Sequence, residues 1–142
     1  MLIRLSNTNL QVTDPTHDIR GYRVVDRDEK DIGEVDDLIL DRDERKVRFL
    51  EVASGDLFGF GPAKTLIPTD AIAHIRDKVV RIDQTRRHVA AAPRYDPDLL
   101  ARDVEAQGYV GDVYRHYGFL PYGRPGYVYP PHRVNTDPGD EC

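Results

Sequence analysis

Residues 21–41, GYRVVDRDEKDIGEVDDLILD, constrain the fold of this chain more than any other segment. Two short apolar stretches flank a charged turn at residues 28–31, a pattern typical of a β-hairpin because turn residues satisfy local backbone groups. Gly33 opens the second stretch and is expected at a bulge, where the backbone needs room. The segment therefore predicts that the chain begins as a meander of small hairpins.

Four later segments continue this pattern, and polar turns separate most of them. Residues 46–52, 65–68 and 79–83 are expected to be strands, and residues 71–75 a short strand or a single turn. Strands at spacings near ten residues in so short a chain favour a small antiparallel barrel over a sandwich. We place this barrel domain at residues 19–95, after an N-terminal strand or arm at residues 1–18.

The C-terminal part has a different character. Asp96 is a good N-cap and Gly108 a good stop, so residues 97–107 are predicted to be helical, and a second apolar stripe runs from Val110 to Tyr117. Residues 96–118 form the expected helical extension. Residues 119–142 are rich in Tyr, Pro and Gly, which predicts an irregular tail. The fold class is thus mainly β with a short α-helical C-terminal extension.

Bulk composition excludes several functional classes. The 142 residues carry a formal net charge of −5 with acids and bases interleaved, which makes nucleic acid an unfavoured partner. The only cysteine, Cys142, fits a reducing compartment. We expect a cytoplasmic protein without a signal peptide or membrane segment, because no uncharged apolar run reaches about 18 residues.

Four short motifs occur in order along residues 21–93: Gly21 with Val24, Ile32-Gly33-x-Val35 with Asp37, the run VRFLEV at 47–52, and Leu66-Ile67-Pro68. With these motifs the segment resembles a PRC-barrel domain, the small β-barrel of the photosynthetic reaction centre H subunit and of a ribosome maturation factor. The resemblance extends toward the H subunit through Ala92-Pro93 and residues 105–122, but residues 1–18 cannot supply that subunit's membrane helix. The resemblance implies a PRC-type barrel that acts through its surfaces and carries no general catalytic motif.

Three patterns that could carry chemistry are each better explained by structure. The loop at 59–65 lacks the Gly-Lys-Ser/Thr order and the following helix of a phosphate-binding loop. An acidic series is formed by Asp26, Asp28, Asp31, Glu34, Asp36 and Asp37. An EF-hand would need Gly at position 31 and Glu at position 37, so solvated hairpin charges explain this series better than a calcium site. The five histidines show no zinc motif. We therefore expect no enzyme, no catalytic residue, no cofactor and no metal.

Aromatic residues are the best candidates for an interaction surface. Phe58 and Phe60 lie on a glycine-rich loop, and either cover one end of the barrel or contact a partner. The C-terminal candidates are Tyr114, Tyr117, Phe119 and Tyr122, which belong to a tyrosine-rich region that could wrap its own barrel, contact a partner, or do both across a dimer.

The leading hypothesis is a homodimeric, non-enzymatic adaptor that binds a protein partner and reaches a membrane only through that partner. One alternative is an RNA- or ribosome-associated maturation factor, which the resemblance to that family member implies. The other is a barrel that binds a small ligand or a metal.

Overall fold

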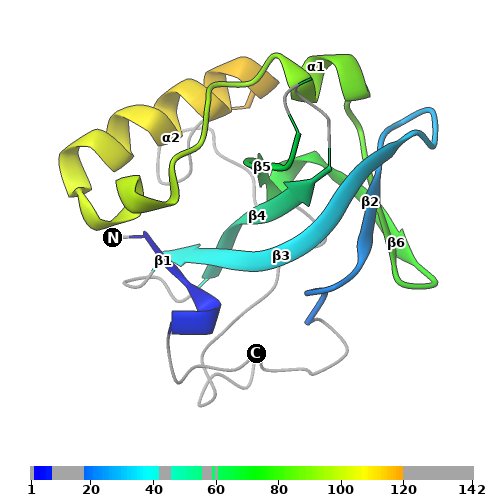
Figure 1. Ribbon diagram of the computed structural model, residues 1–142, viewed down its shortest axis with the longest axis horizontal. Helices are drawn as coiled ribbons and strands as arrows, with labels where there is room; N and C mark the ends of the chain where they lie inside the picture. Colours follow the sequence, from blue (N-terminus) through cyan, green and yellow to red (C-terminus); the bar gives the residue numbers. More distant parts are fainter. Residues whose placement is uncertain (1, 8–17, 42–45, 56–58, 60, 120–142) are drawn as a thin grey trace.

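The computed structural model describes residues 2–7, 18–41, 46–55, 59 and 61–119 (Figure 1). Its main body is one sheet, and the described residues contribute seven strands to it. The strands are β1 (Leu2–Arg4), β2 (Arg23–Val25), β3 (Asp31–Asp41), β4 (Lys46–Ser54), β5 (Ala63–Pro68), β6 (Ile72–Arg76) and β7 (Val79–Ile82). Short 3-10 turns occur at η1 (Leu5–Asn7), η3 (Thr69–Ala71) and η4 (Pro97–Ala101).

The sheet follows the order β5-β4-β3-β2-β7-β6, and β1 pairs with β3 outside this path. Neighbouring strands are antiparallel except β2 and β7, which run parallel. The expected mainly-β fold with a C-terminal helix is confirmed, but the sheet is not closed, since no described pairing joins β5 to β6. The barrel is therefore an open, curved sheet.

Strand β3 is the centre of the sheet and pairs along both of its edges. One edge pairs with β4, and the other is shared between β2 near the start of β3 and β1 near its end. The expected bulge near Gly33 is present, because the β2–β3 register shifts there and leaves Ile32 without a partner. The N-terminal strand that was expected within residues 1–18 is β1, and residues 8–17 lie outside the described part.

Two α-helices follow the sheet. Helix α1 (Arg86–Ala90) was not predicted; it begins where the side chain of Thr85 accepts a hydrogen bond from the backbone N–H of His88. Helix α2 (Asp103–Tyr117) ends at Gly118, which adopts a left-handed conformation with φ 81°. The predicted stop at Gly108 is wrong: residues 97–101 form a 3-10 turn, and one helix continues through Gly108 because its apolar stripe packs on the sheet.

The core lies between the sheet and α2. Val113, Tyr114 and Tyr117 of the helix are buried, and the ring of Tyr114 lies 5.3 Å from that of Phe49 on β4. This burial removes a wide apolar stripe from water, which is the main source of stability for a helix of this length. No helix within the described residues has both the length and the apolar character needed to cross a membrane.

Candidate functional site

The aromatic residues predicted to form an interaction surface do not come together on the described surface. Tyr114 is 0% exposed and Tyr117 5% exposed, so both are used inside the protomer. Phe119 is partly buried and packs against the same core. Phe58, Phe60 and Tyr122 lie outside the described residues. The tyrosine-rich region was expected to wrap its own barrel, to contact a partner, or to do both across a dimer. The tyrosines within α2 pack on their own barrel.

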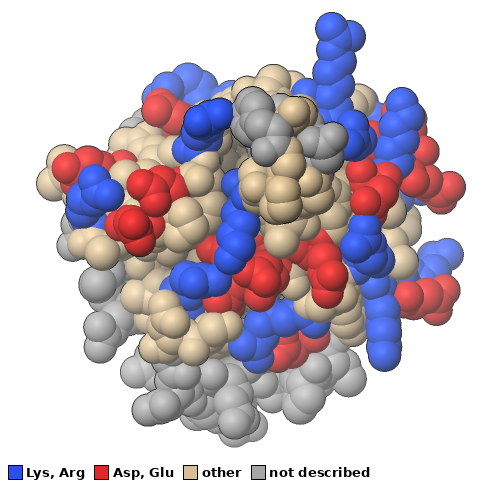
Figure 2. All heavy atoms as spheres, in the orientation of Figure 1, with Lys and Arg blue, Asp and Glu red and all other residues tan. Residues whose placement is uncertain are grey.

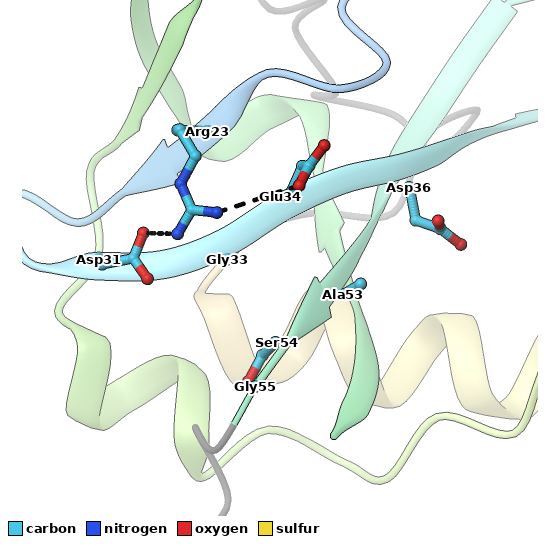
Figure 3. A pocket seen from close by; sticks show the side chains of 8 residues that line it. All are labelled: Arg23, Asp31, Gly33, Glu34, Asp36, Ala53, Ser54 and Gly55. Atoms are coloured by element: carbon cyan, nitrogen blue, oxygen red, sulfur yellow. Dashed lines mark hydrogen bonds and ion pairs between the residues drawn. The ribbon is translucent and has the colours of Figure 1, made fainter. Parts of the chain in front are cut away.

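A charged hollow of about 410 Å³ lies where β3 runs beside the end of β4 (Figure 3). It is lined by Arg23, Asp31, Gly33, Glu34, Asp36, Ala53, Ser54 and Gly55. We call these eight residues the β3 hollow. Ala53 and Gly55 place little side chain there, so backbone forms much of the β4 side while charged groups stand on the β2 and β3 side.

The backbone of Gly33 makes this arrangement possible. A Cβ atom at that position would lie 2.2 Å from the carbonyl oxygen of Ala53, which is far inside van der Waals contact. Glycine therefore lets β3 and β4 approach closely beneath the hollow. Gly33 belongs to the motifs on which the family resemblance rests. The close approach of the Ala53 carbonyl oxygen is the physical reason for a glycine at this position.

Arg23 lies between two carboxylates at one end of the β3 hollow (Figure 3). Its guanidinium donates a hydrogen bond to Asp31, and its second terminal nitrogen lies 4.0 Å from a carboxylate oxygen of Glu34. The side chains of Asp31 and Glu34 are 60% and 54% exposed, so the pairs are solvated and worth little to stability. These charges remain accessible to a binding partner.

Asp36 connects the other end of the β3 hollow to an ionic network below it. Its carboxylate lies 2.7 Å from Nζ of Lys64, and this hydrogen bond lowers the pKa of Asp36 while it raises the pKa of Lys64. Lys64 also lies 3.4 Å from Oε1 of Glu51, a residue with a fully buried side chain. The carboxylate of Asp36 is thereby held in place by a partly exposed cation that also contacts the buried Glu51.

Glu51 is the centre of that network. Arg4 of β1 donates to its Oε1 at 2.7 Å, and the hydroxyl of Tyr95 donates to its Oε2 at 2.7 Å. Burial, followed by the hydrogen bond to Glu51, raises the pKa of Tyr95, so the phenol stays protonated. Arg4 also reaches Asp37 with its Nε at 3.2 Å. The network ties β1, β3, β4, β5 and the segment after α1 together.

The acidic residues of the calcium hypothesis face different partners. Asp26 is buried and accepts hydrogen bonds from the backbone N–H groups of Asp28, Lys30 and Arg86. Asp37 accepts from the backbone of Ser6 and Leu38. Within the described ranges, no group of three or more His, Cys, Asp or Glu side chains is arranged to hold a metal ion. The series divides into structural acids, the exposed acids of the β3 hollow, and Asp28, which is exposed outside the hollow.

Sequence reasoning did not find the β3 hollow, although one signal was available. Glu34 and Asp36 are two positions apart in the sequence, so a strand places them on the same face. Arg23 and Gly55 could not be assigned to the same place, because the registers of the β2–β3 and β3–β4 pairs bring them there. The hollow adjoins the start of the glycine-rich loop, whose residues 56–58 and 60 are not described.

The open sheet and the helix that covers it define a small, mainly β domain. The PRC-barrel domain family matches residues 13–89, more than half of the chain. The chain belongs to the PRC-barrel family. A comparison with curated proteins gave no significant match.

Proposed function

We propose that this PRC-barrel protein is a non-enzymatic adaptor that binds a protein partner through the β3 hollow. The observation that supports this is the hollow itself: exposed charges of both signs stand above a floor of backbone, and Lys64, which also contacts Glu51, holds one of them, Asp36. Charges that are held in place before binding favour orientation and specificity of a docked partner. The cytoplasmic location is part of the same proposal.

The chemistry of the β3 hollow fits a protein better than a small molecule. Pockets for small ligands are mostly apolar with a few polar groups, whereas Arg23, Asp31, Glu34 and Asp36 make this lining chiefly charged. The three carboxylates exceed the one guanidinium, so a partner that presents a basic side chain would find complementary charge. A polar, water-accessible contact of this type is common at the rim of transient interfaces.

The charge distribution supports protein over RNA as the partner. Figure 2 shows one face of the molecule, on which Lys and Arg side chains alternate with Asp and Glu instead of forming one basic area. Affinity for a nucleic acid backbone requires several cations that act together on phosphates. RNA binding is retained as an alternative because of the ribosome maturation factor that the sequence resembles.

The test is a quantitative affinity purification with matched charge-reversal variants. Glu34→Lys changes the β3 hollow, and Glu105→Lys makes the same change at an exposed position on α2, outside the hollow lining. We expect a protein recovered by the wild type to be lost from the Glu34 variant, retained by the Glu105 variant, and bound directly when purified. Equal recovery by both variants would reject the hollow as the docking site.

Two further measurements separate the alternatives. If nuclease treatment removes the captured protein, the result would favour the hypothesis of an RNA-associated factor. If native mass spectrometry shows a bound small molecule or metal, the result would favour the hypothesis of a ligand-binding barrel. Analytical ultracentrifugation tests the proposed homodimer, for which a sedimenting species of one chain mass at micromolar concentration would be contrary evidence. We also propose that the chain resembles the H subunit more closely than other members of the family.

A further inference from the structure

The imidazole rings of His88 and His116 stack on each other, and each ring contacts the backbone of the other residue. His88 lies on α1 and His116 near the end of α2, and their rings stack with centroids 4.0 Å apart and planes 8° from parallel. Nε2 of each ring lies 2.8 Å from the backbone carbonyl oxygen of the other residue. We call this pair the histidine clasp.

The two carbonyl groups fix the position of one proton on each ring. A carbonyl oxygen can only accept, so Nε2 must carry hydrogen in both imidazoles. Nδ1 is then the atom at which each neutral ring takes up a further proton, and histidine is the side chain whose charge ordinarily changes between pH 5 and 8. The clasp therefore contains two adjacent sites for positive charge.

The two rings of the clasp pack against a third ring, which carries no charge. The ring of Tyr117 meets both imidazoles edge-on, at 5.7 Å from His88 and 4.9 Å from His116, and burial raises the pKa of Tyr117 so that it stays neutral. Arg87 and Arg115 are the sequence neighbours of the two histidines and add positive charge. Asp112, one turn before His116, already accepts a hydrogen bond from Arg115 at 2.9 Å.

We infer that the histidine clasp is a proton-sensitive latch, which stays closed while at most one ring is charged and opens when both rings are protonated. The first proton preserves both hydrogen bonds, since a charged N–H group is the stronger donor. The second places two positive charges at the distance of the stack, where their repulsion acts directly. Separation of the rings relieves this repulsion.

Opening of the latch would act on the C-terminal part of the chain. Helix α1 is attached to the turn after β2, because the backbone N–H of Arg86 donates to Asp26 at 2.7 Å. The clasp joins α1 to the last turn of α2, which lies directly before Gly118 and Phe119. Acidification would therefore loosen the last turn of α2 from α1. This regulation is independent of the proposed docking at the β3 hollow.

The direct test is an NMR titration of the unaltered protein from pH 8 to pH 5. We expect the ring signals of His88 and His116 to change in two separate steps, as coupled sites do, with contacts between the rings lost only in the second step. His74, the other histidine in the described residues, lies on β6 outside the clasp and serves as the internal control. Retention of the ring contacts at pH 5 with both rings protonated would overturn the inference.

A double-mutant cycle separates a latch from a purely structural contact. His88→Asn, His116→Asn and the double variant are compared by urea unfolding at pH 7.5 and pH 5. We expect the coupling between the two positions, expressed as a ratio of unfolding equilibrium constants, to fall by roughly tenfold at the lower pH. A coupling equal at both pH values would show that the stack has only a structural role. If a variant does not fold, the titration of the unaltered protein decides.

Discussion

Gly33 on β3 faces the carbonyl oxygen of Ala53 on β4 so closely that a Cβ atom at position 33 would lie 2.2 Å from that oxygen. The obstructing atoms belong to the backbone of a central strand, so neither strand can move aside without loss of pairing. The approach of these two residues sets both the β3–β4 ladder and the floor of the β3 hollow.

Gly33→Ala is expected to destabilise the protein by about 3 kcal/mol or more, because relief of the clash must separate two central strands. Urea unfolding followed by circular dichroism measures the change. Gly55→Ala is the matched control: it lines the same hollow, has nothing within 4 Å of an added Cβ, and should change stability by less than about 1 kcal/mol. Similar values for the two variants would contradict the close approach.

Asp26→Asn should remove about 2 to 3 kcal/mol of stability at neutral pH, because a buried carboxylate loses its charge-assisted hydrogen bonds to backbone N–H groups. The exposed Asp28→Asn, in the same turn, is the control and should be nearly neutral. Comparison of the two unfolding free energies at pH 7 checks the prediction.

Asp26 should also contribute to acid sensitivity. Burial by itself would raise the pKa of Asp26, but hydrogen bonds from the backbone of Lys30, Arg86 and Asp28 hold it below the ordinary value of 3.8. The unfolded chain therefore binds this proton first, and the stabilisation is lost as the pH falls below about 4. The unfolding free energy of the Asn variant should depend less steeply on pH below that value. Parallel pH profiles for the variant and the wild type would contradict the assignment.

Lys78→Gly should stabilise the β6–β7 turn by about 1 kcal/mol. Asp77 and Lys78 have φ values of 55° and 62°, the left-handed pair that a two-residue hairpin turn requires and that glycine adopts without strain. Lys78→Ala retains the unfavourable backbone and removes the same charge, so it should give no gain. Thermal unfolding of the two variants distinguishes the backbone effect from the charge effect.

Gly108→Ala should stabilise α2 by about 0.5 to 1 kcal/mol, because glycine inside a helix costs that much and an added Cβ would have nothing within 4 Å. Gly118→Ala should act in the opposite direction, since Gly118 ends the helix at φ 81°. Opposite signs in chemical denaturation would verify one continuous helix. Destabilisation by both changes would indicate a break at Gly108.

Local sequence patterns located the strands well. Apolar runs between polar turns placed β2, β3, β4, β5 and β7 within a few residues of their observed bounds, because each hairpin is decided by nearby residues. Gly108 misled the helix prediction, since a local stop signal was overridden by burial of Ala106 and Tyr109 on either side of it. The five-residue α1 gave too short a pattern to recognise.

The candidate site was less accessible to sequence reasoning because it depends on the exact register between neighbouring strands. Glu34 and Ala53 meet through the β3–β4 register, and Arg23 joins them through β2. The contact between His88 and His116 likewise requires the packing of two helices on one sheet. Tyrosine composition correctly marked a region of large contact area, but it could not tell that Tyr114 and Tyr117 use that area within the protomer.

The parallel pairing of β2 with β7 has a consequence for folding kinetics. Strands β3, β4 and β5 form a meander of neighbouring hairpins, and β6 with β7 forms another, so both can assemble by closing short loops. The ladder from Arg23 to Val79 joins the two and must close a long loop first, which carries a larger entropic cost. Formation of this ladder is the step that we expect to limit the folding rate of the whole domain.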